Sequence, residues 1–298
     1  MKIDVGIAAN KNQEQKWWAT LLPELLALER RGKVEVQRFI VIGSALTDYN
    51  RNKVVATFLD GGDSEALWFI DDDTIPPPRA VEWLVDLLET GPCEVAAGIY
   101  YSRSAPFNPI AYQRRPNGLY IPLARFEPGE IVYVDSVGMG CTLIRERVFS
   151  TIQEQYRVYG RVANGTLVPV HREDMREGDP LQPGVVMGPG EARGYVVEPI
   201  AGPVDVEEWP FYAFEHGRTE DHFFCEMALR CGFRIAVDTA LECQHVGMEP
   251  TTRQRFQDVK DMLGSYAAVR VEMGEDDGGR PTADHARVEE EEWRGTVG

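Results

Sequence analysis

The sequence predicts an α/β fold with a mostly parallel sheet flanked by helices, and three observations predict it. Strand-like and helix-like segments alternate three times before residue 100, which is typical of parallel strands joined by right-handed crossovers. The run Ala66–Ile70 is wholly apolar, as in a strand buried on both faces of a parallel sheet. Asp71, Asp72 and Asp73 follow it at once, and ligands bind at the carboxyl ends of such strands.

The elements of the first half follow from apolar spacing and from the glycines and prolines between the apolar runs. Leucines and tryptophans recur at helical spacing up to Gly32, and a second amphipathic pattern stops at Gly61, because glycine readily ends a helix. Pro76–Pro78 opens a third helix. The expected elements are strands at 3–8, 34–42, 66–70 and 95–99 and helices at about 13–31, 53–61 and 80–89, with a polar turn at 48–52.

The second half is less regular. Residues 100–135 alternate tyrosine, proline and glycine with short strand-like pieces, and 160–217 is a glycine- and proline-rich insertion that is too long for an ordinary loop. The acidic segment 269–298 is expected to be a disordered tail, so residues 1–268 form one predicted domain. The expected elements here are strands at 132–134, 136–144 and 234–237 and helices from about 145, at 219–232 and at 252–268.

Composition limits the possible partners. The net charge is −17 and the pI is near 4.8, which argues against direct nucleic-acid binding and against docking on anionic lipid. The five cysteines are scattered without a Cys-x-x-Cys pair, which suits a reducing compartment. The first residues read as a strand and no apolar run is long enough to span a bilayer. We therefore expect a soluble, cytoplasmic protein without a transmembrane segment.

The three aspartates need an explanation of their own. At about 5 Å and an effective dielectric constant of about 20, each adjacent pair of carboxylates costs roughly 3 kcal/mol. A hard divalent cation with oxygen ligands would relieve that repulsion. The alternative is a helix cap, since Asp73 or Thr74 could cap the helix that opens at the prolines.

The order of these motifs resembles a known family. An apolar strand ending in Asp-x-Asp, a Gly-x-Gly segment, a Thr-Glu-Asp turn opening a helix and a late histidine resemble the GT-A-type (Rossmann-like) glycosyltransferases, most closely glycosyltransferase family two, over roughly residues 1–250. The resemblance implies that Asp71 lies near the donor ribose, and that Asp71, Asp73 and His245 form a site for Mn²⁺ or Mg²⁺. It implies that Asp221 is the catalytic base.

The same resemblance assigns the donor site. Arg51 and Asn52 match an Arg-Asn pair near the nucleotide, and Gly138 and Gly140 match a segment beside the donor sugar. Asn10, at the end of the first strand, is also expected to bind the donor. One feature departs from the family: where relatives carry Asp-Asp-Gly-Ser to read the base, this chain has Ile42-Gly43-Ser44. The donor nucleotide is therefore left open.

Each assignment has a structural alternative. Acids in the first turn of a helix stabilise its dipole, which would account for Asp221. His245 could be a hydrogen-bonded histidine, Arg51 and Asn52 could cap a turn, and the two glycines could allow close backbone packing. Some further residues admit only a weak assignment, either to sugar stacking or core (Tyr100, Tyr101, Arg103) or to the surface (His216, His222).

The sequence thus predicts a metal-dependent, hexosyltransferase-like enzyme that moves a sugar from a nucleoside-diphosphate sugar to the hydroxyl of an unidentified acceptor, with inversion. One alternative is a nucleotidyltransferase that makes nucleotide sugars, although no glycine-rich basic loop follows the first strand. The other alternative is a non-catalytic acidic interaction protein.

Overall fold

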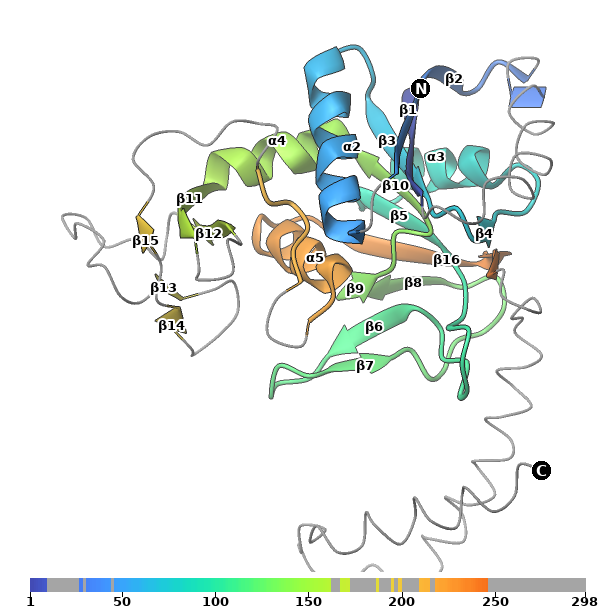
Figure 1. The fold of residues 1–298 in the computed structure, drawn as a ribbon. Coiled ribbons are helices and arrows are strands. Elements are labelled where there is room, and N and C mark those ends of the chain that lie inside the picture. The colour runs from blue at the N-terminus through green and yellow to red at the C-terminus, as the bar shows by residue number, and fades with distance from the viewer. Residues whose placement is uncertain are drawn as a thin grey trace, which may run out of the picture. The chain divides into compact units, whose positions relative to one another are not determined.

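Figure 1 shows the fold in a computed structural model. The structure describes residues 1–9, 27–28, 31–43, 46–161, 167–171, 186–187, 194–195, 198–199, 209–214 and 218–245. All of them fall within one compact unit, 1–257. The predicted helices at 13–31 and 252–268, the boundary at 268 and the acidic tail lie largely or wholly outside the described residues.

A seven-stranded sheet with the order β2-β1-β3-β10-β5-β16-β8 forms the centre of the fold. Strands β2, β1, β3, β5 and β16 run in one direction, whereas β10 and β8 run antiparallel to their neighbours. The predicted α/β class with a mostly parallel sheet is confirmed. The strands are β1 (Lys2–Ala9), β2 (Glu35–Gly43), β3 (Ala66–Ile70), β5 (Val95–Ile99), β8 (Ile131–Val134), β10 (Cys141–Arg145) and β16 (Ile235–Glu242).

Helices cover both faces of this sheet, and β3 contributes to both cores. Leu67 and Phe69 pack in a core with α2, α4 and α5, whereas Trp68 packs in a second core with α3. All five residues of β3 are buried, as its unbroken apolar run predicts. The helices are α2 (Thr47–Gly61), α3 (Ala80–Thr90), α4 (Glu146–Gln155) and α5 (Glu220–Arg230).

Two smaller pairings lie beside the main sheet and shape the site. A three-stranded sheet has the order β7-β6-β9, and β17 pairs antiparallel with β4. Short strands also occur within the glycine-rich insertion. The bounds are β4 (Thr74–Ile75), β6 (Ala111–Arg114), β7 (Tyr120–Pro122), β9 (Ser136–Val137), β17 (Gln244–His245), β11 (Tyr156–Arg161), β12 (Leu167–His171), β13 (Val186–Met187), β14 (Gly194–Tyr195) and β15 (Glu198–Pro199).

One sequence-based expectation about local structure was wrong, and one alternative is excluded. The segment 48–52, expected as a polar turn, forms the first turns of α2; its polar residues had concealed the helical pattern. Asp73 and Thr74 cap no helix, because α3 begins later, with Arg79 as its N-cap residue, and Thr74 lies in β4. No helix among the described residues has the length and apolar character needed to cross a membrane.

Candidate active site

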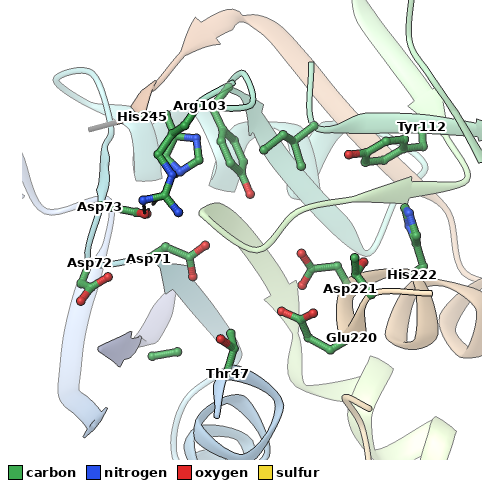
Figure 2. Close-up of a pocket in the computed structure, with 14 residues that line it drawn as sticks. Thr47, Asp71, Asp72, Asp73, Arg103, Tyr112, Glu220, Asp221, His222 and His245 are labelled. Carbon is green, nitrogen blue, oxygen red and sulfur yellow. Dashed lines mark ion pairs between the residues drawn. The ribbon is translucent and has the colours of Figure 1, made fainter. Parts of the chain in front are cut away.

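A cavity of about 320 Å³ opens where the carboxyl end of β3 faces the first turn of α5. Figure 2 shows that side chains distant in sequence point into it from opposite sides, with Asp73, Arg103 and His245 at one end and His222 and Tyr112 at the other. The lining residues are Ala8, Thr47, Asp71, Asp72, Asp73, Tyr100, Arg103, Ile110, Tyr112, Thr219, Glu220, Asp221, His222 and His245.

One end of the cavity is formed by Asp73 and His245. The β4–β17 pairing places His245 opposite Thr74, so the histidine Nε2 lies 3.4 Å from Asp73 Oδ2. Arg103 Nη1 lies 2.9 Å from the same carboxylate oxygen. Burial opposes ionisation of Asp73, but the hydrogen bond with His245 and the charge of Arg103 outweigh it and lower the pKa of this carboxyl group.

A hydrogen bond fixes the orientation of the His245 ring. Its Nδ1 lies 2.7 Å from the carbonyl oxygen of Tyr101, and a carbonyl can only accept, so Nδ1 carries the proton. Nε2 is then the ring nitrogen that faces Asp73; with a proton it donates to the carboxylate, and without one its lone pair is available to a cation held between the two side chains. A backbone carbonyl that fixes the tautomer in this way is the usual support of a metal-binding histidine. His245 is therefore both hydrogen-bonded, as the structural alternative supposed, and directed into the cavity.

The Asp73–His245 pair has the donor atoms for a divalent cation, one carboxylate oxygen and one imidazole nitrogen. It does not form a complete cage. Among the described residues, no three His, Cys, Asp or Glu side chains are grouped closely enough to hold a metal by themselves. The expected set of Asp71, Asp73 and His245 is thus not brought together, because Asp71 turns to Arg51. Two protein ligands fit a Mg²⁺- or Mn²⁺-type ion that takes its other ligands from water and substrate phosphate.

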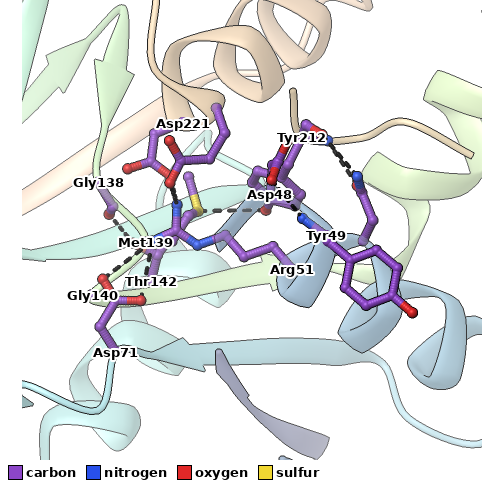
Figure 3. A network of polar contacts seen from close by, with 12 residues as sticks. Asp48, Tyr49, Arg51, Asp71, Gly138, Met139, Gly140, Thr142, Tyr212 and Asp221 are labelled. Atoms are coloured by element: carbon purple, nitrogen blue, oxygen red, sulfur yellow. Dashed lines mark hydrogen bonds and ion pairs between the residues drawn. The ribbon is translucent and has the colours of Figure 1, made fainter. Parts of the chain in front are cut away.

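Arg51 bridges Asp71, which follows β3, to Glu220 and Asp221 at the start of α5 (Figure 3). Its side chain is 3% exposed; Nη2 lies 3.1 Å and 3.2 Å from the two carboxylate oxygens of Asp71. Nη1 lies 2.6 Å from Glu220 Oε1 and also pairs with Asp221. With three carboxylates around it, Arg51 is held as a structural counter-ion between β3 and α5. It does not line the cavity.

Burial, together with the neighbouring acids, raises the basicity of Asp221. Burial raises the pKa of Asp221 well above its ordinary value, and the nearby charges of Glu220 and Asp71 add to this effect, while Arg51 opposes it. Burial also raises the pKa of Glu220 against the opposing charge of Arg51. A carboxylate that is buried among other anions is a stronger proton acceptor than an exposed one. The helix dipole alone therefore does not account for the environment of Asp221, because burial and neighbouring carboxylates also change its pKa.

Gly138 and Gly140 serve close backbone packing. A Cβ on Gly140 would lie 2.7 Å from Thr74 Oγ1 and 2.8 Å from Tyr100 Cζ. The Gly140 N–H donates to the Tyr100 hydroxyl at 3.0 Å, and its carbonyl accepts from the Asp71 N–H at 3.2 Å. The turn before β10 thereby positions the aspartate run. The packing interpretation of these glycines accounts for both positions, since Gly138 meets Tyr100 as well.

The remaining donor-site residues are placed elsewhere. The amide of Asn52 holds the backbone of Tyr212, donating to its carbonyl at 2.8 Å and accepting from its N–H at 2.9 Å, and Asn52 does not line the cavity. Asn10 lies outside the described residues, as does His216. Tyr101 is buried in the core, whereas Tyr100 is both buried and cavity-lining.

His222, expected at the surface, is a residue that sequence reasoning missed. It lines the cavity next to Asp221 and its ring stacks on Tyr120 with centroids 4.1 Å apart. One signal could have identified it. Side chains in the first turn of a helix fan around its end, so a residue adjacent to Asp221 can face the same space.

No family model matches this sequence, and no curated protein does. Among solved structures, the chain is similar to A197 from STIV, with 13% identity and a TM-score of 0.46 over 85% of this chain and 91% of that one.

Two other solved structures are similar over less of their length. Glucosyl-3-phosphoglycerate synthase from Mycobacterium tuberculosis, solved with Mn²⁺, UDP-glucose and phosphoglyceric acid, has 16% identity and a TM-score of 0.31 over 52% of this chain and 60% of that one. GalNAc-T7, solved with UDP, GalNAc and Mn²⁺, has 8% identity and a TM-score of 0.42 over 88% and 47%. This chain therefore spans less than two thirds of either. Identities and TM-scores this low leave function to be argued from the site itself.

Proposed function

We propose that this protein is a metal-dependent glycosyltransferase of the GT-A type that moves a sugar from a nucleoside-diphosphate sugar to an acceptor hydroxyl, with inversion at the anomeric carbon. One observation carries the proposal: Asp73, His245 and Asp221 line a single cavity although they come from three separate parts of the chain. A cation-binding pair and a buried base facing one space are the two groups that this reaction needs.

The Asp73 end is the proposed site of the leaving diphosphate. As the glycosidic bond to the donor breaks, negative charge accumulates on the phosphate oxygens. A bound Mn²⁺ or Mg²⁺ supplies Lewis-acid stabilisation of that charge. Asp73 and His245 would hold the ion, and Arg103, half exposed beside Asp73, would add a second positive charge near the phosphates.

Asp221 is the proposed general base. The acceptor oxygen attacks the anomeric carbon as its proton passes to a carboxylate oxygen of Asp221, while the bond to the diphosphate oxygen breaks on the opposite face. The burial that raises the pKa of Asp221 favours this proton transfer, because a base becomes more effective as its pKa approaches the working pH. Arg51 holds the carboxylate in place throughout.

A screen tests the proposal. The protein is incubated with a panel of nucleotide sugars and Mn²⁺, and released nucleoside diphosphate is measured with and without a mixture of sugar acceptors. We expect release with at least one donor, its loss on adding chelator, and a loss of about a hundredfold or more in Asp73→Asn, since a metal ligand supplies several kcal/mol of charge stabilisation. The matched control is Asp63→Asn, an exposed aspartate outside the cavity.

The two alternatives predict different results from the same screen. A nucleotidyltransferase would release pyrophosphate from a nucleoside triphosphate and a sugar phosphate. A non-catalytic interaction protein would release nothing from any donor. Chelator-resistant turnover, or full activity in Asp73→Asn, would refute the metal role.

A further inference from the structure

The end of the cavity opposite Asp73 is lined by His222 and Tyr112, which have no role in the proposed donor chemistry. We call these two residues the wall. Tyr112 from β6 stands edge-on to the His222 ring, with centroids 4.7 Å apart and planes at 87°. Tyr120 from β7 lies flat against the same ring at 4.1 Å and 5°. Ser136 Oγ is 2.6 Å from His222 Nδ1. Three contacts from three strands therefore fix one imidazole at the cavity surface beside Asp221.

The fixed ring presents one polar atom for recognition. Ser136 engages Nδ1, and Nε2 has no hydrogen-bond partner among the described residues. Tyr112 and His222 line the cavity, whereas Tyr120 stands behind the histidine, where its hydroxyl donates to Glu226 Oε1 at 2.7 Å. The wall thus combines aromatic surface with a single ring nitrogen and a phenol, and these are groups that pack against and hydrogen-bond a polyol.

The charges around the wall indicate whether it suits a neutral or an anionic polyol. Burial and the charge of Arg218 lower the pKa of His222 to about 4, so the ring is neutral at pH 7. Arg218 pairs with Glu226, so its charge is compensated. Of the described residues that line the cavity, Arg103 is the only lysine or arginine, and it lies at the far end beside Asp73, whereas the carboxylates of Glu220 and Asp221 lie next to the wall. An anionic acceptor would be repelled at the wall.

We propose that His222 and Tyr112 form the acceptor subsite and that the acceptor is an uncharged, hydroxyl-bearing molecule of the carbohydrate class. The inference rests on the proposed function and adds the acceptor to it. Figure 2 shows the order along the cavity, with the Asp73–His245 end, then Asp221, then the His222–Tyr112 wall. An acceptor sugar against this wall directs a hydroxyl toward Asp221, on the side away from the diphosphate end. His222 Nε2 and the Tyr112 hydroxyl bond its neighbouring hydroxyls.

The test separates donor chemistry from acceptor binding. Hydrolysis of the nucleotide sugar without acceptor reports on the donor site alone. Transfer is then measured at pH 7.5 to methyl glycosides of neutral hexoses and to the 6-phosphates and uronic acids of the same sugars. We expect transfer to a neutral glycoside and, in His222→Ala, a KM for that acceptor raised about tenfold or more, as for the loss of a hydrogen bond and a packing surface. The donor KM and the hydrolysis rate should change less than about twofold.

Further variants guard against a folding artefact. Tyr112→Phe keeps the ring and loses the hydroxyl, and His222→Asn keeps a group that can bond Ser136; both should raise the acceptor KM with an unchanged melting temperature. The matched control is His171→Ala, because His171 also stands edge-on to a tyrosine, Tyr156, at 4.9 Å and contacts Gln155 at 3.1 Å, but lies outside the cavity.

Three results would overturn the inference. The first is a phosphorylated or carboxylated sugar preferred over its neutral parent, and the second is His222 variants that lose hydrolysis and transfer equally. In the third, the wild-type protein releases no nucleoside diphosphate from any donor, with or without acceptor; that outcome overturns the proposed function and the acceptor assignment together.

Discussion

At the residue scale, one side of the site is organised by a buried arginine that pairs with three carboxylates. Arg51 lies among Asp71, Glu220 and Asp221, so the cluster carries a formal charge of −2 when all four groups are ionised. Burying unbalanced charge is unfavourable, and the raised pKa values of Glu220 and Asp221 express that cost. The same imbalance makes Asp221 a stronger base. If Asp221 is the base of the proposed reaction, function and stability make opposing demands on this residue.

Asp221→Asn should separate the two demands. Burial raises the folded-state pKa of Asp221 above its unfolded value, so the wild-type protein loses stability as the pH rises from the ordinary aspartate range through the folded pKa. The variant lacks this loss and leaves Arg51 with two carboxylates. We expect Asp221→Asn to be more stable than wild type at pH 8, by roughly 1–3 kcal/mol, and nearly equal to it at pH 4, while transfer is abolished.

Urea unfolding at several pH values measures this difference, with Asp63→Asn on the surface as the control. A variant that is less stable than wild type at pH 8 would show that the Arg51–Asp221 pair is net stabilising. That result would contradict the account of charge imbalance.

At the scale of elements, the turn between β9 and β10 positions the aspartate run. Gly140 packs against Tyr100 and Thr74 with no room for a side chain, and its carbonyl holds the Asp71 N–H. The pairing of β4 with β17 then sets His245 opposite Thr74. A displacement of this turn would therefore move Asp71, which it holds directly. It would also move His245, because Thr74 packs beside the glycine and pairs with His245 in β4–β17.

Gly140→Ala is expected to destabilise the protein by about 1–3 kcal/mol, the usual range for forcing an extra methyl group into a packed site. It should also lower transfer, because Asp71 and Thr74 must move. Gly43→Ala is the matched control, since a Cβ there meets nothing closer than 3.9 Å. Thermal melting and the nucleoside diphosphate assay measure the two effects. Equal melting temperatures for the two variants would contradict the packing argument.

At the scale of the whole molecule, the site joins chain segments that lie far apart in the sequence. Asp73 and His245 come from distant parts of the sequence and meet because β17 pairs with β4. A ligand that binds both stabilises the folded chain against unfolding. The protein supplies two candidate metal ligands, so the cation should bind weakly by itself and more tightly when a diphosphate completes its coordination.

Thermal shift measurements test this coupling. We expect Mn²⁺ alone or nucleoside diphosphate alone to raise the melting temperature by at most about 2 °C, and the two together by more than the sum of the single shifts, about 6 °C or more, as for ligands far above their Kd. Asp73→Asn should abolish the combined shift, and Asp63→Asn should retain it. Additive shifts in the wild-type protein would argue against a shared metal–diphosphate site.

The sequence by itself determined the order of elements and the class of the fold. An unbroken apolar run such as Ala66–Ile70 can be satisfied only by burial on both faces, and glycines and prolines mark where elements end. Asp73, Asp221 and His245 could be proposed as site residues because each lies near the end of a helix or strand, and all three line one cavity. The segment 48–52 was misread as a turn, since its polar residues carry no apolar period although tertiary packing makes it helical.

Only the tertiary structure decided which of these residues pair with one another and which line the cavity. It turned Asp71 away from the Asp73–His245 pair and toward Arg51, removed Arg51 and Asn52 from the cavity surface, and brought His222 into it beside Tyr112. The physical reason is that charge pairing and ring stacking act across space between elements. Local spacing fixes where a side chain sits on its own helix or strand, but its partners are supplied by how the strands return to the sheet.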